Sequence, residues 1–165
     1  MPRQWAAEES MRIHADAATI YELVADVRHM ARWSPECLAV WARPGPARTG
    51  QTFVGWNRRR GLVWFTNCRV AVASPGREFA FTVTTFGLPV ARWGYRLTQD
   101  GHGTTTVTEH WTDLRSGRGA WLSQTLGLIF TGTRPSSRYA VNRQGMRETL
   151  RRLRTDAEAT RRTHP

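Results

Sequence analysis

The sequence contains no lysine, and all 24 of its basic residues are arginine. With 13 acidic residues the formal net charge is +11, and a strongly basic chain is the usual first sign of nucleic-acid binding. However, the codon usage of a GC-rich genome also produces a basic set made of arginine alone, so part of the excess is compositional. We therefore do not expect a nucleic-acid partner. An Arg-rich RNA-binding or membrane-surface protein stays open as a third alternative.

Cysteines and long apolar runs are also scarce. Cys37 and Cys68 have neither metal-ligand spacing nor the density of a disulfide framework, which predicts two buried free thiols. The first residues, "MPRQWAAEES", lack the apolar centre of a signal peptide. The longest apolar stretch, "WLSQTLGLIF" at 121–130, is about half of the roughly 20 residues that a membrane span needs. We expect a cytoplasmic protein without a membrane span.

Motifs for metal, nucleotide or serine-triad chemistry are missing as well. There is no phosphate-binding glycine loop, no GxGxxG, no paired His and Cys ligands, and no Ser-His-Asp set that strand alternation would bring together. The "GHG" at 101–103 has the composition of a hairpin turn. His29 and His110 are expected at the surface. The sequence therefore predicts no metal and no other cofactor.

The amino-terminal part of the chain is predicted to form a strand followed by two short helices. Residues 8–15 form the expected opening strand. In "ADAATIYELVADV" (15–27), Asp16 is a helix N-cap and the apolar residues recur at helical spacing. The next segment, "RHMARW", continues as a second short helix that ends before Pro35, since the residue before a proline avoids helical backbone angles.

A run of alternating segments and a long helix complete the chain. Turn-type sequences separate six expected strands at 37–43, 50–58, 62–73, 77–86, 89–98 and 104–113, which predicts an antiparallel meander. Residues 136–160 carry one stripe of side chains at spacings of three and four, so this helix should bury Met146, Leu150 and Leu153 against the sheet. For residues 118–134 two interpretations stay open: a helix of their own or a mobile lid.

Five segments carry a resemblance to a known family: "IHADAATIYELVADVRHMARWSPE", "TGQTFVGWNRR", "WFTNCRVAVASPGREFAFTV", "ARWGYRLTQDGHGTTTVTEHW" and "RQGMRETLRRL". In this order the chain resembles the SRPBCC or START-like superfamily, in its polyketide cyclase/dehydrase-like branch. The resemblance implies one α+β domain over 1–165, with its core at about 8–160. It implies a helix-grip fold: a seven-stranded antiparallel curved sheet around a long C-terminal helix, with a hydrophobic cavity between them. It does not assign a role to any single residue, because the active residues vary between members of this family.

Glu109 is the first candidate for chemistry. In "TTTVTEHWTD" (104–113), strand alternation puts Glu109 on one face with Val107 and Trp111. A carboxylate among apolar neighbours should have a raised pKa unless an arginine reaches it. Two interpretations stay open: Glu109 is a ligand-facing or catalytic group, or it is a structural group paired with Arg134 or Arg138.

The other candidates share the inward face of the strands or the stripe of the long helix. Tyr95 is the second catalytic candidate. The expected ligand-binding residues are Asn57, Trp64, Thr66, Phe81, Trp93, Trp111, Tyr139, Asn142 and Met146.

Three functions follow from these candidates. The first is a polyketide cyclase/dehydrase-like protein that binds a hydrophobic, polyketide-like or polycyclic small molecule and cyclises or dehydrates it by acid–base chemistry. The second is a non-catalytic carrier or sensor of such a ligand, and the third is the Arg-rich surface binder. A homodimer is compatible with each of them.

Overall fold

The computed structural model describes residues 6–115 and 135–163. Its sheet consists of β1 (Ala6–Ile13), β2 (Cys37–Trp41), β3 (Thr52–Arg59), β4 (Leu62–Ser74), β5 (Glu78–Thr85), β6 (Leu88–Gln99) and β7 (Thr105–Asp113). The helices are α1 (Ala17–Ala25), the single-turn η1 (Val27–His29), α2 (Met30–Trp33) and α4 (Pro135–Thr163). This is the expected α+β helix-grip fold, and the segment 118–134 lies outside the described residues.

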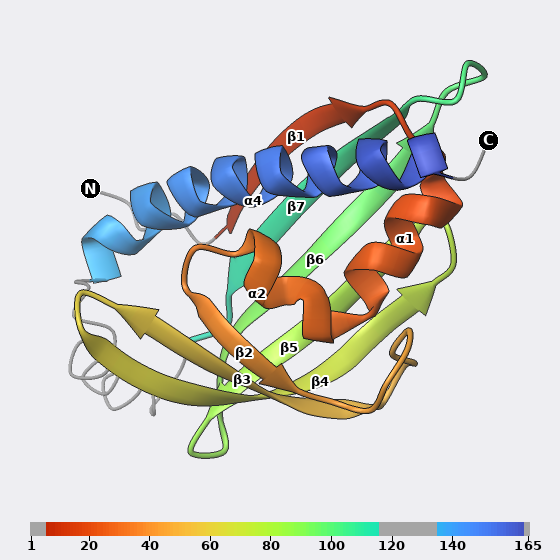
Figure 1. The fold of residues 1–165 in the computed structure, drawn as a ribbon. Helices are drawn as coiled ribbons and strands as arrows, with labels where there is room; N and C mark the ends of the chain where they lie inside the picture. Colours follow the sequence, from red (N-terminus) through yellow and green to blue (C-terminus); the bar gives the residue numbers. More distant parts are fainter. Residues whose placement is uncertain (1–5, 116–134, 164–165) are drawn as a thin grey trace.

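The strands form one antiparallel sheet in the order β1-β7-β6-β5-β4-β3-β2. Each strand from β2 to β7 pairs with its neighbours in sequence, whereas β1 pairs with β7 at the far edge. Figure 1 shows the sheet curving around α4, with α1 and α2 beside α4 on the same side of the sheet. The expected antiparallel meander is therefore confirmed.

The opening strand lies two residues earlier than the expected 8–15. Asp16 is the N-cap of α1, and its side chain accepts a hydrogen bond from the Thr19 amide at 2.7 Å. The chain bends over residues 14–16 to reach this cap, so the strand ends at Ile13. The expected N-cap is confirmed, and the competition between capping and strand pairing explains the shifted boundary.

The core lies between α4 and the concave face of the sheet. Met146, Leu150 and Leu153 are buried, as the helical stripe predicts, and Leu150 and Leu153 belong to one cluster with Phe79 and Val107. Polar contacts hold the helical layer together: the Trp33 indole nitrogen donates to Asp156 on α4 at 2.8 Å. The amide of His14 donates to Glu158 at 3.1 Å. These bonds tie both ends of the α1–α2 segment to the long helix.

His110 lies on the outer face, as expected, but it is not a free surface group. Only 14% of its side chain is exposed, and its Nε2 lies 3.8 Å from a carboxylate oxygen of Glu78. The ring covers Gly94 on the neighbouring strand, where a glycine leaves room for it. His29 is also half-buried, against the ring of Trp33. The expectation of two exposed histidines was wrong, because Gly94 leaves room for the ring of His110 and Trp33 offers a ring for His29 to pack against.

Gly94→Ala is expected to destabilise the fold by about 1–3 kcal/mol, since overpacking a filled site forces its neighbours to move. A Cβ atom at this position would lie 2.6 Å from His110 Nε2 and 2.7 Å from the Cβ of Ala80. The control is Gly145→Ala on α4, where the nearest atom would be Pro35 Cγ at an ordinary 3.7 Å. That variant should gain about 1 kcal/mol from helix propensity. Urea denaturation measures both, and equal shifts in the two variants would contradict the packing argument.

Candidate functional site: a cavity between the sheet and the long helix

A cavity of about 700 Å³ lies between the inner face of the sheet and α4. Its walls come from β3 to β7, from the segment that joins α2 to β2, and from the first half of α4. The volume falls within the range of about 300–1,000 Å³ that is typical of small-molecule sites. The cavity exists because one helix cannot fill the concave side of a seven-stranded sheet.

The structure brings ten of the eleven candidate residues to this cavity. Both catalytic candidates, Glu109 and Tyr95, line it. So do eight of the ligand-binding candidates: Asn57, Trp64, Thr66, Phe81, Trp93, Trp111, Asn142 and Met146. Strand alternation and the helical stripe thus identify the lining, and contact with a ligand stays a prediction.

Tyr139 was expected at the cavity and does not line it. It packs instead at the edge of a small cluster formed by Ala7, Ala91, Trp111 and Met146. The Arg143 guanidinium lies 5.8 Å from the centre of the Tyr139 ring. Tyr139 faces the β1–β7 edge of the sheet, whereas Arg138 and Asn142 in the same part of α4 line the cavity.

Glu109 lies in the wall of the cavity without a charged partner among the residues that the structure describes. It is 4% exposed, and its Oε1 accepts a hydrogen bond from the Tyr95 hydroxyl at 3.4 Å. Within residues 6–115 and 135–163, its Oε2 has no hydrogen-bond partner. Desolvation therefore raises the pKa of Glu109 to about 8, although the Tyr95 hydrogen bond lowers it. The expected raised pKa is confirmed, and the carboxyl group is mostly protonated at neutral pH.

The alternative pairing of Glu109 with an arginine is not found for Arg138. Arg138 Nη2 instead donates to Glu36 Oε2 at 2.9 Å, and Arg134 lies outside the described residues. Tyr95 is buried beside Glu109. Burial, and to a smaller extent the charge of an ionised Glu109, raises the pKa of its hydroxyl well above 10. The phenol is therefore a hydrogen-bond donor at any physiological pH.

Asn142 places a second polar group in the same cavity. It lies on α4, 4% exposed, and lines the cavity. Its Nδ2 has no hydrogen-bond partner among the described residues. A buried amide that makes no hydrogen bond is costly, by about 1–3 kcal/mol, so a polar atom of a ligand or an ordered water is expected there. Asn142 and Glu109 thus offer polar atoms to the interior from α4 and β7.

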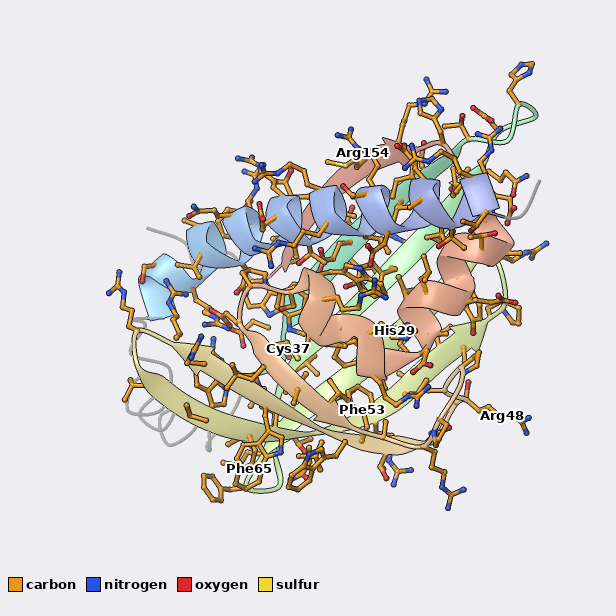
Figure 2. All side chains as sticks on the ribbon, viewed as in Figure 1. His29, Cys37, Arg48, Phe53, Phe65 and Arg154 are labelled. Carbon is orange, nitrogen blue, oxygen red and sulfur yellow. The ribbon has the colours of Figure 1, made fainter. Side chains whose placement is uncertain are left out.

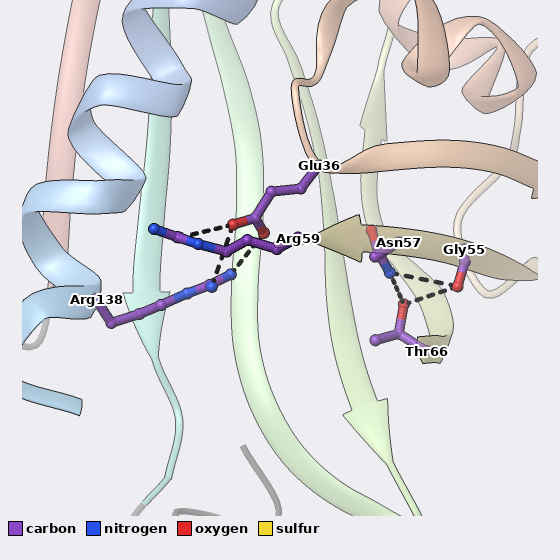
Figure 3. Close-up of polar contacts among 6 residues, drawn as sticks. All are labelled: Glu36, Gly55, Asn57, Arg59, Thr66 and Arg138. Atoms are coloured by element: carbon purple, nitrogen blue, oxygen red, sulfur yellow. Dashed lines mark hydrogen bonds and ion pairs between the residues drawn. The ribbon is translucent and has the colours of Figure 1, made fainter. Parts of the chain in front are cut away.

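Asn57 and Thr66 add polar atoms to the cavity wall on β3 and β4, and their hydrogen bonds are weak. Asn57 Nδ2 donates to the Gly55 carbonyl and lies 3.4 Å from the Thr66 hydroxyl. Figure 3 shows these three residues together on the inner side of the sheet. Their contacts are long, at 3.4 Å, so a ligand can exchange with them at little cost.

An ion triad lies at the end of the cavity where α4 begins. Glu36 accepts from Arg59 at 3.0 Å and from Arg138 at 2.9 Å, and it connects the α2–β2 segment, the end of β3 and the start of α4 (Figure 3). Sequence reasoning missed this triad. Arg59 and Arg138 lie 23 and 102 residues from Glu36 in the sequence, and no local spacing indicates such a contact.

The two thiols are buried and free, as expected, and both line the cavity. Desolvation raises the pKa of Cys37 to about 11 and that of Cys68 to about 12. Neither is therefore a thiolate nucleophile at neutral pH. In the described parts of the chain, no three His, Cys, Asp or Glu side chains are grouped as metal ligands.

Comparison with known proteins places the chain in a family. A family model described as "Polyketide cyclase / dehydrase and lipid transport" matches residues 4–158, and the chain belongs to this family. No curated protein matches the chain. No helix among the described residues has both the length and the apolar character required to cross a membrane.

Solved structures share the fold. A polyketide-cyclase-like protein from Corynebacterium glutamicum is 28% identical, with a TM-score of 0.63 over 99% of this chain and 98% of that one. The Zhui aromatase/cyclase from a Streptomyces species is 16% identical, with a TM-score of 0.65 over 93% of each chain. The two-domain aromatase/cyclase StfQ of the steffimycin pathway is 13% identical, with a TM-score of 0.64, and matches 94% of this chain and 46% of its own.

Proposed function

We propose that the chain binds a polycyclic or polyketide-like molecule in the cavity and cyclises or dehydrates it, with Glu109 and Tyr95 as the proton-transfer pair. The observation that carries this proposal is the carboxyl group of Glu109. It is buried in a cavity wall, its Oε2 has no partner among the described residues, and its pKa is raised to about 8. A general acid or base works best when its pKa lies near the operating pH.

The position of the proton defines the expected chemistry. With Tyr95 donating to Oε1, the acidic proton of Glu109 belongs on Oε2 and is available to a ligand carbonyl oxygen. In an aldol-type ring closure, an enol carbon attacks the carbonyl carbon, and the carbonyl oxygen takes the proton from Glu109. The carboxylate then receives the enol proton, so Glu109 returns to its starting form and no further reactant is needed.

Asn142 and the aromatic side chains would position the substrate. The Asn142 amide can donate to a second oxygen of the ligand. Trp64, Trp93 and Trp111 offer flat apolar surface, and the rings of Trp93 and Trp111 lie 6.4 Å apart. Holding the reacting atoms together is itself a large part of catalysis for an intramolecular reaction. The family description and the aromatase/cyclase neighbours support this substrate class.

Thr66→Phe is expected to weaken ligand binding about tenfold or more, because the ring would occupy the cavity beside Asn57. The matched control is Thr84→Phe on the next strand, which faces outward and whose hydroxyl also bonds a backbone carbonyl. Quenching of tryptophan fluorescence by 1,8-dihydroxyanthraquinone, a polycyclic ketone, measures the affinity. Equal affinities in both variants would refute binding in the cavity. Binding without turnover of any β-polyketone would favour a carrier or sensor.

A further inference from the structure

A row of aromatic side chains crosses the outer face of the sheet, on the side opposite α4. Trp41, Trp56, Phe65 and Phe86 follow one another with ring centroids 5.2, 5.7 and 6.4 Å apart. Trp41 is 65% exposed and Phe86 is 62% exposed. Figure 2 shows Phe65 pointing away from the long helix, into the space beneath the sheet. We call these four residues the aromatic face.

Two hairpin tips next to the aromatic face have unusual turn residues. The β3–β4 tip is Arg60-Gly61, with φ of 48° and 82°, and the β5–β6 tip is Phe86-Gly87, with φ of 50° and 76°. Two-residue hairpin loops with both φ values positive strongly favour Asn or Asp in the first position, since other side chains are strained there. Arginine and phenylalanine thus occupy strained positions at neighbouring tips. The turn geometry favours neither side chain.

The strands that carry Trp41, Trp56 and Phe65 have charged residues of one sign only, although one of them, Arg59, is paired with Glu36 at the cavity. Residues 37–77, which include β2, β3 and β4, contain no Asp or Glu at all and carry seven arginines: Arg43, Arg48, Arg58, Arg59, Arg60, Arg69 and Arg77. Exposed aliphatic side chains lie on the same strands: Val63 shares the outer face with Phe65, Leu62 lies beside the β3–β4 tip, and Leu38 is on β2. Exposed aromatic and aliphatic groups edged by arginine match a surface that is anionic outside and apolar beneath.

We propose that the aromatic face and its two hairpin tips dock onto the surface of a membrane that contains anionic lipid. The negative surface potential of such a membrane attracts the arginines. Tryptophan and phenylalanine side chains are favoured in the interfacial layer between water and the lipid chains. The aliphatic residues favour a bilayer over a nucleic acid, because they offer bases no stacking surface. Arg59 and Arg60 also line the cavity, so a docked protein would hold this end of the cavity at the membrane. The proposal does not depend on catalysis or on any cavity ligand.

Replacing the strained tip residues by asparagine separates docking from folding. Arg60→Asn and Phe86→Asn should keep or raise the melting temperature, since Asn tolerates the left-handed conformation. Binding to phosphatidylglycerol/phosphatidylcholine vesicles, measured by co-sedimentation, should weaken about fivefold for Arg60→Asn, or about 1 kcal/mol for one arginine. Phe86→Asn should weaken it about tenfold or more, because a large apolar side chain loses its burial.

The control variant is Arg154→Asn, an exposed arginine on α4 that Figure 2 places on the opposite side of the molecule. It removes the same charge and should change vesicle binding by less than about twofold. Absence of binding to the anionic vesicles, equal binding to pure phosphatidylcholine, or equal loss in Arg154→Asn would overturn the proposal. So would a stable dimer that buries Trp41, or oligonucleotide binding that the two tip variants weaken while vesicle binding is unaffected.

Discussion

Glu109→Gln is expected to lower the turnover of a β-polyketone substrate by about 100-fold or more, the usual loss when a general acid or base is removed. Glutamine has nearly the shape of the protonated carboxyl group and still accepts the Tyr95 hydrogen bond at Oε1. It cannot release and recapture a proton. Affinity for the ligand should therefore change only a few-fold, whereas kcat should carry most of the loss.

Two further variants make this result specific. Tyr95→Phe removes only the hydrogen bond to Glu109 and should reduce turnover less than Glu109→Gln does. Glu78→Gln changes a carboxylate on the outer face, beside His110, and should leave turnover unaltered. If Glu109→Gln retains full turnover and affinity, Glu109 has no role in catalysis or binding, and the proposed proton transfer fails.

The stability of the protein should fall between pH 5 and pH 8 because of the same carboxyl group. Glu109 has a pKa of about 8 when folded and an ordinary 4.5 in the reference state, so the folded chain holds a proton that the unfolded chain releases. The contribution of this proton to the free energy of unfolding is fully present below the pKa of Glu109 in the unfolded chain. It is lost as the pH rises toward the pKa of Glu109 in the folded protein. Linkage gives at most about 1.4 kcal/mol per pH unit, or about 4 kcal/mol over this window.

The difference between wild type and Glu109→Gln isolates this effect. Urea denaturation of both proteins at pH 5, 6, 7 and 8 should give free energies of unfolding that diverge steadily, with the variant the more stable at pH 8. All other titratable groups are the same in both proteins, so their contributions cancel in the difference. Parallel curves would mean that Glu109 is ionised in the folded protein, paired with a group such as Arg134.

Alternation and helical spacing were sufficient to predict the cavity lining. A strand residue has only two possible faces, and the apolar face of β7 carries Val107 and Trp111 with Glu109 between them. The partners of Glu109 could not be predicted in the same way. Arg138 was an equally good candidate by position, yet it pairs with Glu36, whose place in space depends on where Pro35 ends the short helix.

The angle around a helix was the second source of error. Tyr139 fits the stripe of α4 as well as Asn142 does, but a spacing of three residues leaves its side chain about 60° to one side of Asn142 around the helix. Tyr139 therefore faces the β1–β7 edge, whereas Arg138 and Asn142 line the cavity. His110 shows a further limit. Its burial depends on Gly94 of the neighbouring strand, and the register that joins them is a property of the pairing, not of either strand alone.

The position of β1 at the far edge of the sheet also affects how the protein is assembled. Strands β2 to β7 pair in sequence order, so each hairpin can close as soon as its second strand is made. The first strand has to wait for β7, since Ala6 pairs with Thr112 across most of the chain, and for α4, whose Arg143 bonds Glu9. Contacts between distant residues form slowly, because a long loop must close first. During synthesis on the ribosome, β1 therefore stays unpaired until β7 has emerged, and Glu9 gains its arginine partner only when α4 follows.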